Sequence, residues 1–133
     1  PERFRAAARA GFSAVEFLWP YEHTKDRVRE WLDENGFKFL LFNTLKHMSA
    51  TGRQMSATDE PGAGVVPGRE GEFREIIELA LDYSRALGGE MIHVTAGPVP
   101  DGLTAEACER VFIANLKSVL SKKTILIRKN FGN

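Results

Sequence analysis

The chain has 133 residues with 18 basic and 18 acidic side chains, and 43% of it is hydrophobic. This balance predicts one soluble globular domain with a real core, and it excludes the strongly basic surface typical of proteins that bind nucleic acid or membranes. A single cysteine, Cys108, permits no internal disulfide, so a reducing compartment such as the cytoplasm is expected. The chain begins at Pro1 without an initiator methionine, so a fragment or a trimmed chain is expected.

The first part of the chain predicts two helices, each followed by a strand. Residues 2–10 are rich in alanine and arginine and run into a glycine, as a helix does at its end. The short apolar run 14–19 follows as a strand. Thr24 is placed to cap the next helix, which is expected to end before Gly36, and the nearly continuous apolar run 37–42 predicts the second strand.

The second part repeats this alternation after a long loop, residues 43–68, which shows no periodic pattern. An amphipathic helix then ends at the glycine pair 88–89, and residues 91–96 predict a third strand. Thr104 can cap a last helix, and residues 124–127 predict a fourth strand. The expected buried positions of these two helices are Phe73, Ile76, Ile77, Ala80, Leu81, Ser84 and Leu87, then Cys108, Val111, Phe112, Leu116 and Val119.

Helices that alternate with continuous apolar strands predict an α/β fold, in which a parallel sheet is covered by helices. A closed eight-stranded barrel needs ~250 residues. The chain therefore supplies about half of such a barrel, or it forms a small open sheet. Periodicity alone does not separate these two architectures.

Five motifs follow one another along the chain: GFSAVEFLWPYE (11–22), LFNT (41–44), VPGREGEFRE (66–75), YSRALGGEMIHVTAG (83–97) and FIANL (112–116). Together, in this order and spacing, they resemble the hydroxypyruvate isomerase family, and the related 2-oxo-tetronate isomerases are similarly close. The resemblance implies a partial (β/α)8 TIM barrel of the xylose-isomerase-like superfamily that lacks the first strand and the C-terminal half. Residues 1–133 then form a single partial domain, family-like over 1–116, with a divergent basic tail at 117–133.

The resemblance also implies a reaction, the isomerisation of hydroxypyruvate to tartronate semialdehyde through an enediol. Such chemistry needs two acid/base groups flanking the substrate, usually helped by a divalent metal or a polarising cation. In the family these groups are two glutamates, one in a Glu-Pro-Ile-Asn motif at the end of the fifth strand and one near the eighth. Here Arg128 stands where the first is expected, and the eighth strand is missing. We therefore expect a truncated or frame-altered copy, inactive alone, with no cofactor of its own; a divalent metal is implied only for the full-length fold.

Two other hypotheses stay open. The first is a non-catalytic remnant or interaction module that self-associates through the open strand edges of a half-barrel. The second is a metal-dependent endonuclease on the same barrel, which would need a cluster of metal ligands and a basic groove. The sequence shows neither of these features, and no nucleic-acid or membrane partner is expected.

Arg69 is the main candidate for binding a small hydroxy-keto carboxylate substrate. It follows a strand-end loop at the start of a helix, on the side where barrels keep their sites. Its forked guanidinium matches the geometry of a carboxylate. The alternative is an ordinary solvated surface arginine.

Three further residues are candidates for the same pocket. His93 faces the barrel interior if its neighbours in the strand face the helices; the alternative is a hydrogen-bonded core histidine. Glu16 interrupts the first strand and, if it points inward, needs a partner; it would touch substrate or orient Arg69 or His93. Asn43, at the C-terminal end of its strand, either lines the pocket or serves a turn.

The remaining polar and reactive residues suggest no chemistry. His23 and His47 have no ligand-like spacing, and no metal site is expected. Cys108 falls on the apolar face of a helix, as a buried thiol does. Trp19 is expected to pack rather than to stack on a ligand. No GxGxxG, P-loop or CxxC pattern occurs, which leaves nucleotide and structural-zinc sites unsupported.

Overall fold

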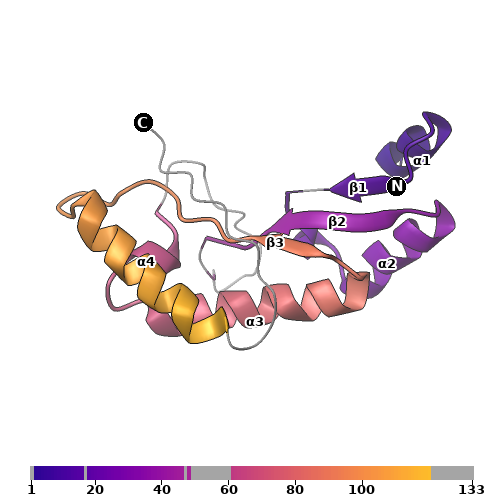
Figure 1. Ribbon diagram of the computed structural model, residues 1–133. Helices are drawn as coiled ribbons and strands as arrows, with labels where there is room; N and C mark the ends of the chain where they lie inside the picture. Colours follow the sequence, from indigo (N-terminus) through magenta and orange to yellow (C-terminus); the bar gives the residue numbers. More distant parts are fainter. Residues whose placement is uncertain (1, 17, 47, 49–60, 121–133) are drawn as a thin grey trace.

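The computed structural model describes residues 2–16, 18–46, 48 and 61–120 (Figure 1). His47, the tail from residue 121 and the predicted strand 124–127 lie outside the described residues. The elements in chain order are α1 (Glu2–Arg9), β1 (Ala14–Glu16), the 3-10 turn η1 (Pro20–Glu22), α2 (Lys25–Glu34), β2 (Lys38–Asn43), the 3-10 turn η2 (Ala63–Val65), α3 (Glu70–Leu87), β3 (Met91–His93) and α4 (Ala105–Leu120).

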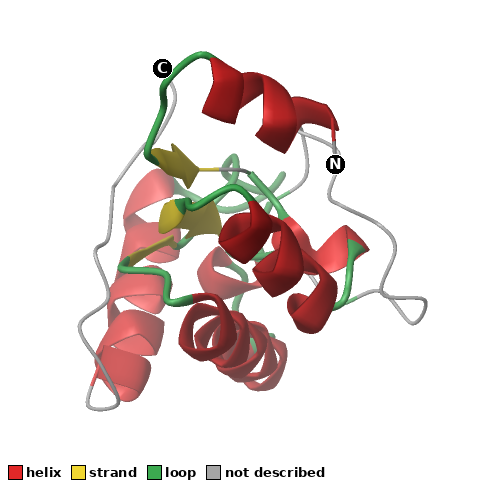
Figure 2. Ribbon diagram, turned by 90° about the vertical axis from the view of Figure 1, so that its right-hand side faces the viewer, coloured by secondary structure: helices red, strands yellow, loops and turns green. Residues whose placement is uncertain are grey.

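The three strands form one parallel sheet in the order β1-β2-β3. In the register of β2 and β3, Leu41 lies beside Met91 and Asn43 lies beside His93. In Figure 2, α1 lies next to the N-terminus, with the strands beneath it. Each strand is followed by a helix before the next strand begins, which confirms the predicted α/β alternation.

The strands β1 and β3 are shorter than the apolar runs 14–19 and 91–96 that predicted them, whereas β2 has the predicted length and is shifted by one residue. The predicted strand 91–96 ends at His93, because Thr95 donates its N–H to the Thr44 hydroxyl instead of to a neighbouring backbone carbonyl. The segment 43–68 is also not a loop throughout, since it contains the turn η2, whose residues are buried. The continuous apolar runs therefore located the three described strands but overestimated the length of β1 and β3.

The predicted ends of the helices are confirmed. Thr24 accepts a hydrogen bond from the Arg27 N–H at 3.3 Å, and Thr104 accepts one from the Ala107 N–H at 3.2 Å, as N-cap residues do. Gly88 ends α3 in the left-handed conformation with φ 68°, where a side chain would be strained. Within the described residues no helix is long and apolar enough to cross a bilayer.

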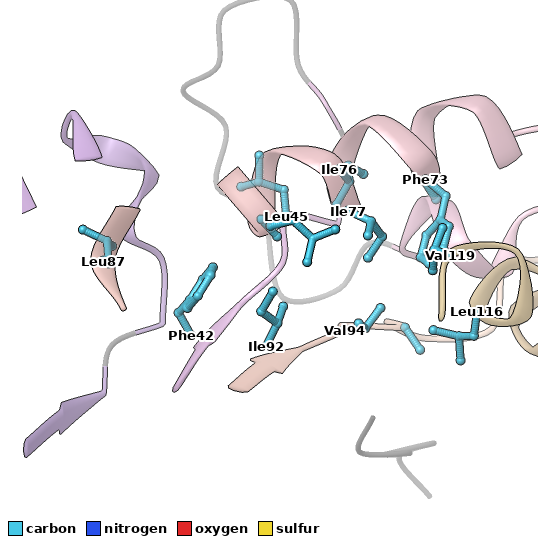
Figure 3. Close-up of a cluster of buried hydrophobic side chains, with 14 of the residues drawn as sticks. Phe42, Leu45, Phe73, Ile76, Ile77, Leu87, Ile92, Val94, Leu116 and Val119 are labelled. Carbon is cyan, nitrogen blue, oxygen red and sulfur yellow. The ribbon is translucent and has the colours of Figure 1, made fainter. Parts of the chain in front are cut away.

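The core lies between one face of the sheet and the helices. Phe42, Ile92 and Val94 point toward Ile76 and Ile77 of α3 (Figure 3), and all five side chains are at most 5% exposed. All seven predicted α3 positions are buried. The next residues along the strands, which face the other way, are only half-buried. This open face of the sheet carries the polar residues of interest.

The buried face of α4 differs from the predicted one at two positions. Val111 is only half-buried, whereas Asn115 is 5% exposed. The Asn115 side-chain amide donates to the Gly64 carbonyl at 2.9 Å, and this bond turns the helix face toward η2. Apolar periodicity could not reveal a polar residue that is buried to serve a distant backbone carbonyl.

Candidate functional site

The candidate site lies where β2 and β3 end. Beyond the last pair of the ladder, the Thr44 N–H donates to the His93 carbonyl at 2.9 Å, and the Thr95 N–H donates to the Thr44 hydroxyl at 3.1 Å. The segment leading to α3 is fastened to the same edge, because the Gly62 N–H donates to the Ala96 carbonyl at 2.8 Å. The carboxyl edge of the sheet, where barrels keep their sites, is thus held by hydrogen bonds that main-chain N–H groups donate.

Asn43 and His93 are in direct contact on the open face of the sheet. The Asn43 side-chain oxygen, Oδ1, lies 2.9 Å from Nδ1 of His93. Both residues are half-buried, while Phe42 and Ile92 beside them point into the core. The structure therefore confirms that the neighbours of His93 face the helices, and it brings together two of the four predicted site residues.

Tyr21 bonds to the main chain of Asn43 and so fixes one member of this pair. Its hydroxyl donates to the main-chain carbonyl of Asn43 at 3.0 Å, and its ring packs edge-on against Tyr83 at 4.9 Å and Phe42 at 6.1 Å. Burial raises the pKa of Tyr21 well above its usual range, so the hydroxyl stays protonated as a donor. No sequence pattern signals this role, because the partner is a backbone atom 22 positions away.

Arg69 immediately precedes α3 and is paired with an acid of that helix. Its Nε donates to Oε2 of Glu72 at 2.7 Å and its Nη2 donates to Oε1 at 2.8 Å. The Met48 N–H also donates to Glu72, at 2.8 Å. Glu72 thus offsets the unfavourable charge of Arg69 at a helix start. The pairing uses one side of the guanidinium, and the opposite edge, with Nη1, makes no hydrogen bond within the described residues.

Glu16 contacts neither the Asn43–His93 pair nor Arg69 through a hydrogen bond of the described residues. It is exposed on the edge strand β1 and pairs in register with Leu41. The expectation that Glu16 orients Arg69 or His93 finds no contact in the described part of the chain to support it, since Arg69 is bonded to Glu72 and His93 to Asn43. Contact between Glu16 and a substrate stays a prediction.

A cavity of about 940 Å³ lies elsewhere, between α1, β1, η1 and α2. Glu16, Trp19 and His23 line it, whereas Arg69, Asn43 and His93 do not. Trp19 packs against the core as predicted, and His23 is exposed with its ring edge-on to Trp31 at 4.8 Å. The candidate site therefore lies outside this cavity, at the strand ends.

Two polar residues near the strand ends, Lys46 and Thr95, were not among the candidates that the sequence suggested. Lys46 is 7% exposed, and its carbonyl accepts from the Ala63 N–H at 2.7 Å. The Thr95 hydroxyl is buried and finds no hydrogen-bond partner among the described residues. An unsatisfied buried hydroxyl costs about 1–3 kcal/mol, and a water or ligand oxygen would remove that cost. No group of three or more metal-binding side chains occurs in the described part of the chain.

The fold agrees with what known proteins of similar sequence show. A family model described as xylose isomerase-like TIM barrel matches residues 4–124, and the chain belongs to this family. Membership of this family assigns the parallel sheet to a partial (β/α)8 barrel, as the resemblance implied.

Several relatives with named activities are similar to this chain over most of its length. The chain is 39% identical over 121 residues to a 2-oxo-tetronate isomerase of Haemophilus influenzae, covering 91% of this chain and 44% of that protein. It is 34% identical over 128 residues to the hydroxypyruvate isomerase of Escherichia coli, covering 94% of this chain and 47% of that protein. The crystal structure of a family 2 AP endonuclease from Brucella melitensis superposes with a TM-score of 0.74 at 34% identity, covering 95% of this chain and 48% of that one. The chain spans less than half the length of these relatives.

Proposed function

We propose that this chain is the substrate-holding N-terminal part of an isomerase of the hydroxypyruvate type. Its ligand is a small hydroxy-keto carboxylate, with hydroxypyruvate as the representative. The observation that carries the proposal is the Asn43–His93 pair at the strand ends, in a chain whose relatives are named as isomerases of such acids. Arg69, with one edge of its guanidinium free of described bonds, supplies the cation for the carboxylate.

The chemistry assigns different parts of the ligand to different residues. The isomerisation moves a proton from the hydroxymethyl carbon of hydroxypyruvate to the adjacent carbonyl carbon through an enediol. The free edge of Arg69 suits the carboxylate, since a guanidinium donates two parallel N–H groups to it. His93, on the open face, suits a hydroxyl group of the ligand. Both interactions hold and orient the ligand without moving a proton.

Proton transfer itself needs two acid/base groups placed on the reacting carbons. Glu72 does not meet this need, because its carboxylate is occupied by Arg69 and the Met48 N–H. Glu16 is exposed on the edge strand. No described residue replaces the two glutamates that the family resemblance implies. We therefore assign to this chain binding without turnover.

An endonuclease, the activity for which the Brucella melitensis protein is named, is the other candidate on this barrel. That chemistry depends on clustered metal ligands, which the described residues do not supply. The balanced charge of the chain gives no basic groove for a nucleic-acid backbone. These observations support the isomerase assignment.

Replacing Arg69 by alanine tests the binding proposal. Hydrogen bonds to charged groups contribute about 1.5–3 kcal/mol, so R69A is expected to weaken hydroxypyruvate binding about tenfold to a hundredfold. Titration followed by ¹H–¹⁵N NMR of the 133-residue chain measures this. R69K keeps the positive charge but loses the forked pair of N–H donors. Its affinity for hydroxypyruvate should therefore fall between those of the unmodified chain and R69A.

Arg74 provides the matched control, because it is an exposed arginine of the adjoining helix α3. R74A is expected to bind hydroxypyruvate within about twofold of the unmodified chain, since surface substitutions away from a site change little. Equal losses in R69A and R74A would mean that only net charge matters. Unchanged binding in R69A would remove Arg69 from the site.

A further inference from the structure

We propose that Asn43 is a positioning residue, which holds His93 in the tautomer protonated at Nδ1 so that Nε2 accepts a hydrogen bond from a substrate hydroxyl. This differs from the sequence prediction, in which Asn43 itself binds substrate. The identity of the ligand rests on the proposed function above. The tautomer does not, because it follows from contacts within the chain.

The contact between Asn43 and His93 fixes which ring nitrogen carries the proton. The atom of Asn43 that faces Nδ1 is the amide oxygen, at 2.9 Å. An amide oxygen can only accept a hydrogen bond, so Nδ1 must carry the proton and donate. In a neutral imidazole with one nitrogen protonated, the other is an acceptor. The pair thus defines Nε2 as the acceptor of His93.

Asn43 is itself held rigidly. Its main-chain N–H donates to the Leu18 carbonyl at 2.9 Å, and its main-chain carbonyl accepts from the Tyr21 hydroxyl at 3.0 Å. Tyr21 is in turn packed edge-on against Tyr83. Both backbone groups of Asn43 are therefore occupied, and the side chain is free to serve His93. The main chain of His93 is held as well, since its carbonyl accepts from the Thr44 N–H.

The acceptor nitrogen of His93 is available on the open face of the sheet. His93 is half-buried there, and Nε2 has no hydrogen-bond partner within the described residues. A ligand hydroxyl on this face can therefore donate to Nε2 of His93.

This arrangement predicts selectivity for the hydroxyl group. A site built to bond a hydroxyl rejects the analogue that lacks it, because its own polar groups are then left unpaired. Pyruvate is the matched analogue, since it keeps the keto acid but not the hydroxyl. We expect the unmodified chain to bind hydroxypyruvate about tenfold more tightly than pyruvate, the equivalent of one hydrogen bond of ~1.4 kcal/mol. In N43A this preference should shrink to about twofold or less.

The tautomer is measured by long-range ¹H–¹⁵N NMR of the imidazole rings in the full 133-residue chain, at a pH about two units above the ordinary imidazole pKa. H93Q identifies the His93 signals by removing them, and the exposed His23 serves as internal reference. We expect a donor-like shift at Nδ1 and an acceptor-like shift at Nε2 in the unmodified chain. N43D, which keeps an accepting oxygen, should retain this pattern, whereas N43A should return His93 toward the pattern of His23.

The tautomer of His93 is measured in the unmodified chain, so a variant that fails to fold does not weaken the test. A proton on Nε2 in the unmodified chain would overturn the inference, as would an unchanged tautomer in a folded N43A. If His93 shows the Nδ1–H form while hydroxypyruvate does not bind, the proposed function fails and the positioning role of Asn43 stands.

Discussion

Replacing Phe42 by alanine is expected to lower the free energy of unfolding by about 3–5 kcal/mol, the range measured for buried phenylalanines. Phe42 is 1% exposed, stacks on Phe39 with ring centroids 5.4 Å apart and meets the edge of Tyr21. It points into the cluster between the sheet and α3 (Figure 3). Alanine would leave a cavity that these rigid aromatic neighbours cannot fill. Urea denaturation followed by circular dichroism measures the change.

Phe12 offers the matched control, because it is the same residue type at 65% exposure. F12A should change the free energy of unfolding by no more than about 0.5 kcal/mol, as surface substitutions usually do. A small loss in F42A, comparable to that in F12A, would contradict the assigned core. It would mean that the sheet does not pack on α3 in solution.

Replacing Gly62 by alanine is expected to have the second largest effect, about 1–3 kcal/mol, the usual cost of overpacking. A Cβ atom at this position would lie 2.7 Å from the Thr95 carbonyl oxygen and 2.8 Å from that of Ala96. Both contacts are with backbone, which cannot rotate away as a side chain can. Relief would require breaking the bond from the Gly62 N–H to the Ala96 carbonyl, which fastens the segment before α3 to the strand ends.

Gly71 is the control for this substitution, and the same urea denaturation measures both variants. Its added Cβ would meet only Nη2 of Arg74, at 3.9 Å, which is ordinary contact distance. Because alanine is the better helix former, G71A should leave the chain equally stable or raise its stability by up to ~1 kcal/mol. If G62A were as stable as G71A, the close approach of the two loops at the carboxyl edge of the sheet would be wrong.

Features governed by local rules were predictable from the sequence. The caps Thr24 and Thr104, the helix stop at Gly88 and the buried face of α3 all follow from preferences within one or two helical turns. The same holds for the alternation that turns His93 away from the core. These predictions are confirmed because the neighbours that decide them are close in sequence.

Features governed by distant contacts were not predictable. The Tyr21 hydroxyl serves a backbone carbonyl 22 positions away, and Asn115 serves one that is 51 positions away. The sequence pattern carries no trace of either pair. The partner of Arg69 is different, since Glu72 lies three positions further along the chain, at a spacing where ion pairs form on helices. That spacing was available in the sequence and points to a paired arginine. Self-association through open strand edges stays a prediction.

The central claim is that this chain holds its ligand but does not move the proton. Measuring deuterium exchange into hydroxypyruvate in heavy water, with and without the 133-residue chain, tests it most directly. Enediol formation would replace the protons of the hydroxymethyl carbon by deuterium, which ¹H NMR follows as loss of signal. We expect the ligand signal to broaden on binding, while exchange proceeds at the rate of the buffer alone. Exchange accelerated by the unmodified chain, and restored to the buffer rate in R69A prepared identically, would contradict the account and show a working acid/base pair in these residues.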